Sequence, residues 1–374
     1  MGQTLSEPVT NKISDQGNDK RVMYGLSSMQ GWRINMEDSH TAIPCYKNTN
    51  ASFFAVFDGH GGDSVAKYCG KYLHERIFQS QPFKDRRYRD ALRWGNLVID
   101  EDLRQDPSLR EDTAGCTAVA ALLTKDNVLY VSNAGDSRAV ISTRNGKAIP
   151  LSKDHKPNDA LETARIKQAG GYVEFKRVNG SLALSRAIGD FGFKSNTQLP
   201  PEKQAVTADP DITEHEMTDL DEFMVLACDG IWDCLRNQEV IDYIRHALTL
   251  KKTLQTICEE LMDFCLAESG DMTGIGCDNM TIIIVAFLRK RTTDQWYEWM
   301  ASKQVADPPK RRTPKLPPTV LGARQQQQQQ SSTSPPPKTE LAAINSPPTI
   351  KNHSIGSMTA STTSTTSTTT STST

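Results

Sequence analysis

The sequence lacks the marks of several large classes of protein. Its apolar stretches fall well short of the ~20 residues that a membrane-spanning helix needs. No signal peptide is apparent, and the eight cysteines include no Cys-x-x-Cys pair, which favours an intracellular, reducing setting. There is no Gly-x-x-x-x-Gly-Lys-Ser/Thr loop for a nucleotide, and no Gly-x-Ser-x-Gly or Cys-x5-Arg motif. A P-loop protein and a hydrolase with one of these nucleophile motifs are therefore disfavoured.

Charge is unevenly distributed along the 374 residues. The whole chain has a net charge of −2, but residues 289–374 contain 11 Lys and Arg against 4 Asp and Glu, so residues 1–288 carry −9. An acidic folded part argues against a nucleic-acid partner. From residue 302 onward the sequence is of low complexity, with a Gln run and a Ser/Thr tract. This composition predicts a disordered tail over residues 302–374.

The most informative stretch covers residues 53–62. Residues 53–57 are apolar and typical of a buried strand, and Asp58 follows them directly. The glycines after Asp58 allow a tight turn, which would expose its carboxylate, the carbonyl of Gly59 and the ring of His60.

Two further predicted strands carry an acid at one end. Asp229 follows the apolar residues 223–227, and Asp278 precedes the apolar residues 280–287. A single Asp in such a place is most often only a turn residue. Three strand ends can converge, however, and gathered carboxylates repel one another unless a cation neutralises them.

The candidate ligands of such a cation are all oxygen donors. They are Glu37, Asp38, Asp58, the Gly59 carbonyl, Asp136, Asp229 and Asp278. All-oxygen sets select Mg²⁺ or Mn²⁺, whereas zinc would need a Cys/His cluster that the spacing does not provide. Asp58 is the natural bridging ligand, because its strand end also supplies the Gly59 carbonyl. Two such cations would suit phosphoryl transfer to water.

Arg33 and His60 complete this hypothesis. A guanidinium matches two phosphate oxygens, and an imidazole close to Asp58 is placed to protonate a leaving alkoxide. Each has a plain alternative. The charged segment around Arg33 could be a solvated loop, and most single Arg or His residues have no catalytic role.

The remaining pattern predicts an α+β fold. Helical periodicity covers residues 79–112 and two segments after Asn237, with short strands before and after them. This order suggests two sheets in the middle with helices outside. Residues 289–301 contain three aromatic residues that could anchor a short terminal segment.

The N-terminus carries a lipidation pattern. Met1-Gly2-Gln3-Thr4-Leu5-Ser6 matches the N-myristoylation motif, with Gly2 as the acceptor. The polar composition of residues 1–21 predicts a flexible segment. One myristoyl chain would give only weak, reversible membrane association. The basic cluster of residues 310–315 could add an electrostatic contact, or could instead serve solubility or nuclear import.

Residues 22–288 resemble the type 2C metal-dependent Ser/Thr protein phosphatases, the PPM family. Ordered motifs across the whole span carry the resemblance: Arg33 with Met36–Asp38, then Phe54–Gly62, Gly115–Ala118, Asn133–Arg138, Asp154–Pro157, Ala169–Gly171, Leu184–Asp190, Ala227–Asp233 and Asp278–Thr281. It implies a catalytic domain that is a four-layer α-β-β-α sandwich, with two mainly antiparallel sheets flanked by helices. It also implies hydrolysis of phosphoserine and phosphothreonine in proteins at a dinuclear Mg²⁺ or Mn²⁺ centre.

The resemblance further implies a role for each candidate residue. The two main cation positions would use Asp58 as the bridge, Asp229 and Asp278 on one side, and Glu37, the Gly59 carbonyl and, through waters, Asp38 on the other. A third, weaker position would use Asp136 with Asp229. Arg33 would contact phosphate, and His60 would be the general acid. The supporting residues would be Asp233, near the centre, and Arg186, in or beside a flap over residues 155–194 that varies with substrate.

Two other functions fit parts of the pattern. The same fold could serve a catalytically silent scaffold that binds phosphoproteins, although no ligand position departs from the family pattern. A two-metal phosphodiesterase or nuclease is opposed by the acidic core. We expect a cytoplasmic monomer, with a membrane-associated or nuclear fraction if the terminal motifs are used.

Overall fold

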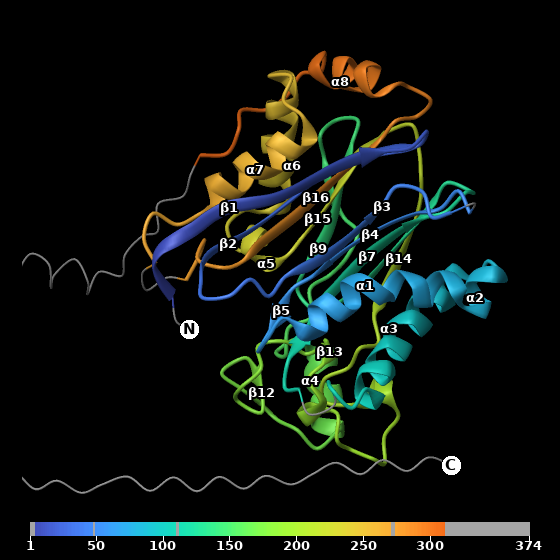
Figure 1. Ribbon diagram of the computed structural model, residues 1–374, viewed down its shortest axis with the longest axis vertical. Helices are drawn as coiled ribbons and strands as arrows, with labels where there is room; N and C mark the ends of the chain where they lie inside the picture. Colours follow the sequence, from blue (N-terminus) through green and yellow to red (C-terminus); the bar gives the residue numbers. More distant parts are fainter. Residues whose placement is uncertain (1–3, 48, 110–111, 271–273, 311–374) are drawn as a thin grey trace, which may run out of the picture. The chain divides into compact units, whose positions relative to one another are not determined.

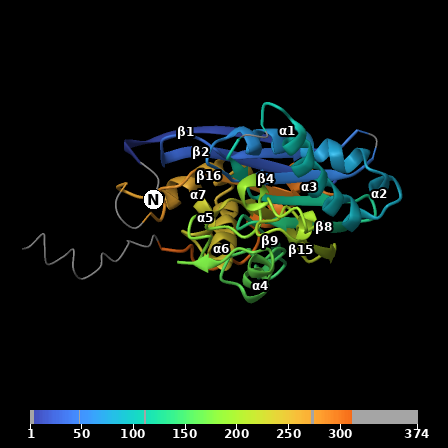
Figure 2. The same ribbon diagram turned by 90° about the horizontal axis from the view of Figure 1, so that it is seen from below.

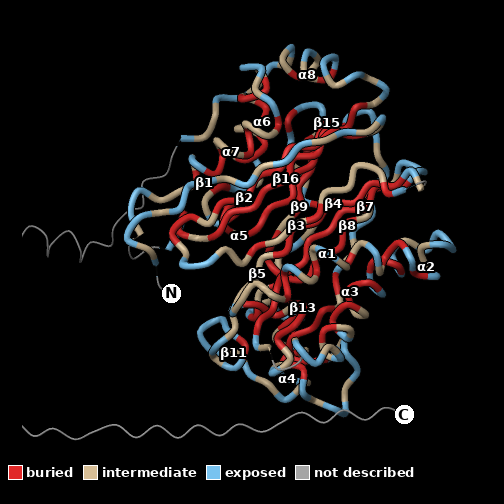
Figure 3. Tube along the Cα trace, in the orientation of Figure 1, coloured by how far each residue is buried: buried red, intermediate tan, exposed pale blue. Residues whose placement is uncertain are grey.

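Fully buried strands occupy the centre of the fold. In the computed structural model, which describes residues 4–47, 49–109, 112–270 and 274–310, four of the described strands longer than two residues are buried along their whole length. They are β4 (Ser52–Phe57), β7 (Ala118–Leu123), β15 (Asp221–Ala227) and β16 (Met280–Phe287). A strand buried on both faces needs a packed layer on each side. The buried centre between exposed outer surfaces is seen in Figure 3.

Two antiparallel sheets form the middle of the molecule (Figure 1). The first has six strands in the order β1-β2-β16-β15-β9-β10, and the second has five in the order β14-β8-β7-β4-β3. The other strands of the first sheet are β1 (Thr4–Asn18), β2 (Val22–Arg33), β9 (Arg138–Thr143) and β10 (Ala148–Pro150). Those of the second are β3 (Ser39–Ile43), β8 (Val128–Ala134) and β14 (Asp211–Glu216).

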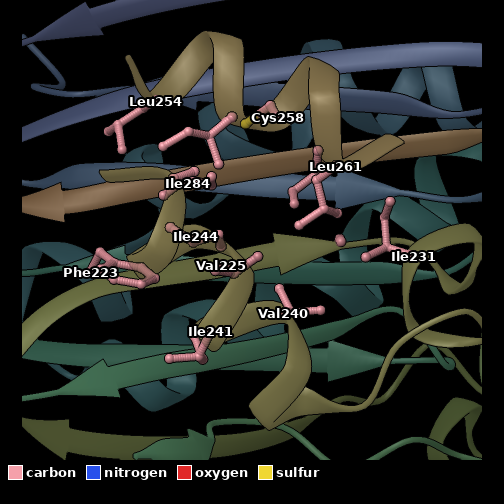
Figure 4. Packing of buried hydrophobic residues seen from close by; sticks show 14 of the residues in the cluster. Phe223, Val225, Ile231, Val240, Ile241, Ile244, Leu254, Cys258, Leu261 and Ile284 are labelled. Atoms are coloured by element: carbon pink, nitrogen blue, oxygen red, sulfur yellow. The ribbon is translucent and has the colours of Figure 1, made fainter. Parts of the chain in front are cut away.

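Successive side chains of β15 serve two different interfaces. Met224 and Leu226 pack with Phe54 of β4 in the cluster between the two sheets. Phe223 and Val225 point the other way, into the cluster beneath the helices (Figure 4). Because side chains alternate along a strand, one continuous apolar run fills both layers of core.

Helices cover both outer faces, which confirms the predicted α+β sandwich with its α-β-β-α layers (Figures 1 and 2). The first sheet is covered by α5 (Asp229–Trp232), α6 (Asn237–Thr249), α7 (Leu254–Cys265) and α8 (Thr293–Ala301). The second is covered by α1 (Ser64–Gln79) and α3 (Tyr88–Gln105), with α2 (Gln81–Lys84) at their junction.

Smaller elements extend the molecule beyond the end of β4. A three-stranded sheet has the order β13-β6-β5, formed by Ile188–Gly189, Gly115–Cys116 and Gly59–His60. The region expected to be the flap contains α4 (Ala160–Gln168), the hairpin of β11 (Val173–Glu174) and β12 (Arg177–Val178), and η1 (Phe191–Phe193). Another 3₁₀ helix, η2 (Pro201–Lys203), follows.

The N-terminal segment corrects the prediction that residues 1–21 are flexible. Residues 4–18 form β1, which pairs with β2 and lies at the edge of the first sheet. The hydroxyl of Tyr24 on β2 donates to Asp15 Oδ2 at 2.7 Å. The segment looks polar because an edge strand is held by backbone hydrogen bonds and has exposed side chains, so the apolar alternation of a buried strand is not needed.

The C-terminal segment is ordered slightly further than predicted. Trp296 of α8 is fully buried, and Lys303 lies 3.6 Å from the carboxylate of buried Glu222. Gly2 and residues 311–374 lie outside the described residues, so the lipidation and most of the disordered tail stay predictions. No helix among the described residues is long and apolar enough to cross a membrane.

Gly25 provides a test of the packing between β2 and α7. A Cβ at this position would overlap the backbone nitrogen of Gln255 and the backbone of Leu254. We predict that Gly25→Ala lowers the free energy of unfolding by about 1–3 kcal/mol, because backbone atoms must move to admit the methyl group. Gly192→Ala is the matched control, since its Cβ would meet nothing within 4 Å. Denaturant unfolding checks both, and equal stability of the two variants would contradict the close packing.

Candidate metal centre

Acids from separate segments meet at one end of the sandwich. Asp58 follows β4, Asp229 begins α5 directly after β15, and Asp278 precedes β16. Asp38 precedes β3, and Asp136 lies between β8 and β9. Since β15 and β16 run antiparallel, the end of one meets the beginning of the other. The strand-end acids of the sequence therefore do converge.

The ligand atoms lie close enough to share a cation. Carboxylate oxygens of Asp58, Asp136 and Asp229 all lie within 4.8 Å of one another. A second group with this spacing contains Asp38, Asp58 and the Cys228 thiol. Burial raises the pKa of Cys228 well above its usual range, which disfavours the thiolate form that a cation would bind. Asp58 belongs to both groups.

Burial and mutual repulsion make these acids costly to ionise. Desolvation, followed by the charges of neighbouring acids, raises the pKa of Asp58 and of Asp229 well above the usual range. Desolvation also raises the pKa of Asp38 to about 7. Asp38 Oδ2 accepts a hydrogen bond from Thr281 Oγ1 at 2.7 Å, while Oδ1 is buried without a partner in the described part of the chain. An unpartnered carboxylate oxygen among like charges fits a divalent cation.

Close backbone packing fixes Glu37 beside Gly59. A Cβ on Gly59 would overlap the carbonyl oxygen of Glu37, so only glycine fits there. Asn279 holds the loop in place, because its Oδ1 accepts from the Glu37 amide at 2.9 Å and its Nδ2 donates to two more carbonyls nearby. Asn279 was not predicted as a site residue, since its partners are far away in the sequence.

Arg33, the last residue of β2, reaches the rim of the cluster. Its Nη2 lies 2.5 Å from Asp278 Oδ2, and its side chain remains 42% exposed. One contact with Asp278 leaves the other guanidinium donors available to an anion.

His60 is held by a residue that the sequence did not single out. Its Nε2 lies 2.7 Å from Oδ2 of buried Asp190. Gly115 permits this approach, because a Cβ there would overlap the Asp190 carboxylate. Desolvation lowers the pKa of His60, but the hydrogen bond and charge of Asp190 outweigh it, so the pKa is raised overall. Asp190 ends the Leu184–Asp190 motif, but its pairing with His60 was not predicted from the sequence.

Asp136 and Asp233 border the cluster and share a cationic neighbour. Lys156 Nζ forms an ion pair with the nearly buried Asp136. Asp233 lies at the end of α5, where desolvation and neighbouring acids raise its pKa against the opposing effect of Lys156. Lys156 belongs to the Asp154–Pro157 motif, but its contact with Asp136 was not predicted.

Arg186, predicted as a supporting residue, contacts the elements around the flap rather than the acidic cluster. It lies 2.8 Å from Glu162 Oε1 of α4 and 2.8 Å from Asp211 Oδ1 of β14. Arg165 also pairs with Glu162, at 2.8 Å. Arg186 therefore connects α4 to the second sheet.

Comparison with known proteins identifies the family. The sequence profile described as Protein phosphatase 2C matches residues 22–271. The chain belongs to the protein phosphatase 2C family. It is 53% identical over 309 residues to Protein phosphatase 2C homolog 2 of Schizosaccharomyces pombe, covering 81% of this chain and 83% of that one. It is 44% identical over 340 residues to Probable protein phosphatase 2C 21 of Arabidopsis thaliana, covering 79% and 95%.

Solved structures agree with this family assignment. The crystal structure of a phosphatase from a pathogenic strain of Toxoplasma gondii is 27% identical, with a TM-score of 0.65 over 74% of this chain and 96% of that one. A serine-threonine phosphatase 2C of Toxoplasma gondii shares the fold, with 21% identity and a TM-score of 0.64 over 74% and 99%. The chain is thus a metal-dependent protein serine/threonine phosphatase. None of these relatives is described as a silent scaffold, so that alternative gains no support.

The Glu162 network predicts a pH-dependent stability. Desolvation opposes its charge, but the two arginines lower its pKa from 4.5 to about 2. A depressed carboxyl pKa contributes stability that is full above about pH 5 and is lost as the pH falls toward 2, by about 3 kcal/mol in total. We predict that Glu162→Gln is clearly less stable than the parent at pH 7, and that the difference shrinks toward pH 3. Exposed Glu101→Gln should change little. Denaturant unfolding at several pH values measures both, and a pH-independent difference would contradict the prediction.

Proposed function

We propose that this phosphatase 2C hydrolyses phosphoserine and phosphothreonine side chains at a centre of two divalent cations, Mg²⁺ or Mn²⁺. The observation that carries the proposal is the cluster of buried and half-buried carboxylates around Asp58, with its raised pKa values and the unpartnered Asp38 Oδ1. The residues that would hold the cations are Asp58, shared by both, with Asp229, Asp278, Glu37, the Gly59 carbonyl and Asp38, and with Asp136 for a weaker third ion. When bound, the cations would activate a water for attack and neutralise phosphoryl charge.

Arg33 would orient the phosphoryl group. Asp278 fixes one side of the Arg33 guanidinium. Because the Arg33 side chain is partly exposed, its other N–H donors are accessible to a phosphoryl group. Two parallel hydrogen bonds from a guanidinium match two phosphate oxygens. Arg33 would thereby hold the phosphorus in line between the attacking and leaving oxygens.

His60 would protonate the leaving seryl or threonyl oxygen. Its Nε2 is bonded to Asp190, which leaves Nδ1 to carry the proton that is donated. The Asp190 carboxylate stabilises the imidazolium and so keeps the acid charged before the reaction. Asp190 is a positioning residue, because it acts through the ring of His60.

Metal removal and ligand substitution test the centre. Excess chelator should abolish turnover of a phosphothreonine peptide, and added Mn²⁺ or Mg²⁺ should restore it. Asp58→Asn should lower the rate at least about 10²-fold, because loss of an outer-shell partner alone typically costs 10- to 100-fold. Asp126→Asn, at an exposed turn, is the charge-matched control. Circular dichroism checks that the fold persists, and near-normal turnover of Asp58→Asn at saturating Mn²⁺ would refute the assignment.

The role of His60 can be tested with two leaving groups. His60→Gln should slow a phosphothreonine peptide by ~10²–10⁴-fold, the usual range for loss of a general acid. The loss should be much smaller for p-nitrophenyl phosphate, whose phenolate leaves without a proton. Asp190→Asn should show the same dependence on leaving group with a smaller effect. Equal losses on both substrates would instead indicate that His60 places water or metal.

A further inference from the structure

A basic cavity lies at the end of the sandwich opposite the acidic cluster. Its volume is about 580 Å³, and it forms where β2 and β15 begin and where β7, β14 and β16 end. Its lining contains five cations and one acid: Lys20, Arg21, Lys125, Arg289, Lys290 and Asp219. In a part of the chain that is acidic overall, such a concentration of positive charge is unusual and points to an anion.

The cavity is remote from the catalytic centre. Asp278 precedes β16 and Arg289 follows it, and this strand of 8 residues is roughly 25 Å long. An anion in the cavity therefore cannot touch the residues proposed for catalysis. Its binding should need none of them.

Arg21 is oriented by uncharged groups. Its Nη2 donates to the Thr124 carbonyl at 2.6 Å, and its Nη1 donates to the Asn50 carbonyl. These contacts fix the guanidinium between the two sheets without neutralising it. Burial has the largest effect on the pKa of Arg21 and lowers it; the charge of nearby Asp19 raises it, and that of Arg289 lowers it. A bound anion would offset the repulsion between Arg21 and Arg289.

Arg289 and Lys290 are held at the cavity by a constrained turn. Both residues have left-handed backbone conformations, with φ of 51° and 65°. The Arg289 Nη2 donates to the Thr218 carbonyl, while its Nε is buried without a partner among the described residues. The same Nη2 also lies 3.6 Å from Oδ2 of buried Asp221, with which it forms an ion pair. A buried guanidinium nitrogen with no acceptor is what a phosphate oxygen would satisfy.

The rest of the lining consists of Asn127 and three apolar side chains. Leu123 and Phe287 are buried side chains, and Met217 lies beside them. A hollow with an apolar wall and converging cations suits a discrete small anion better than a flat membrane surface. Thr4, the first described residue, pairs with Arg33 at the other end of the sandwich, which also does not favour a membrane here.

We propose that this cavity binds a small phosphate-bearing molecule, either inorganic phosphate or a phosphate monoester with an apolar group. Arg21 and Arg289 supply charge-assisted hydrogen bonds to the phosphate oxygens. Lys20, Lys125 and Lys290 add charge at the opening. The apolar wall would contact the organic group of a monoester, a contact that inorganic phosphate cannot make.

The site can be tested by calorimetric titration of the full chain in buffer that contains Mg²⁺. Inorganic phosphate and phenylphosphonate, which cannot be hydrolysed, are the two probes. Inorganic phosphate should bind at a site that survives Asp58→Asn, and Arg289→Gln should weaken that site about 10-fold or more. Tighter binding of phenylphosphonate would assign the site to monoesters, and equal binding would assign it to phosphate itself.

Matched variants make the result decisive. Lys290→Gln should also weaken the probe, whereas Lys251→Gln should not, although Lys251 is an exposed lysine with a left-handed backbone as well (φ 58°). If Arg289→Gln fails to fold, Lys290→Gln with Lys125→Gln replaces it. Turnover of a phosphopeptide without added phosphate should stay unchanged in the variants of Arg289, Lys290, Lys125 and Lys251.

Several outcomes would overturn the proposal. One is phosphate binding that Arg289→Gln and Lys290→Gln leave intact, or that Lys251→Gln weakens equally. Another is binding to phosphatidylserine vesicles that depends on Lys290 while neither small probe binds, which would make this a membrane surface. A third is binding of a doubly phosphorylated peptide alone, which would make it a docking site for phosphoproteins.

Discussion

Repulsion between buried carboxylates is the constraint on which this phosphatase 2C depends. The acids stand at the ends of strands whose side chains are packed between two sheets, so they cannot move apart without disturbing the core. Asp38 is buried and Asp58 is half-buried, and the loss of solvation raises the pKa of both. Lys156 and Arg33 neutralise Asp136 and Asp278, and divalent cations would relieve the repulsion that remains. The packing of the sandwich holds the carboxylates together and so would contribute to metal affinity.

The same arrangement explains which parts were visible in the sequence. An apolar run with an acid at one end indicates both a buried strand and the end of that strand. The sequence alone therefore predicts Asp58, Asp229 and Asp278 at strand ends. Alternation and length also gave the layers of helices and sheets. By contrast, β1 has the composition of a linker, and only its pairing with β2 makes it a strand.

Supporting residues escaped prediction for a different reason. Asp190 lies 130 positions from His60, and Asn279 lies 242 positions from Glu37, so neither pair leaves a local pattern. Lys156 meets Asp136 only because β9 and the turns around it bring them together. All three lie within motifs of the family, but the motifs do not show which residue each one contacts, because those contacts are fixed by tertiary packing, which a single sequence does not display.

The first strand limits where the domain can be truncated. The family profile begins at residue 22, at the start of β2, whereas this chain covers the outer edge of β2 with β1. A chain trimmed to the profile would leave the N–H and C=O groups along one side of a long buried strand without hydrogen-bond partners. Such an edge is a template for pairing with another chain. β1 is itself an edge strand, but its side chains are mostly exposed and include Pro8, Lys12 and Asp15, residue types that disfavour pairing with another chain. Domain boundaries drawn from the catalytic motifs alone would therefore replace a protected edge with an unprotected one.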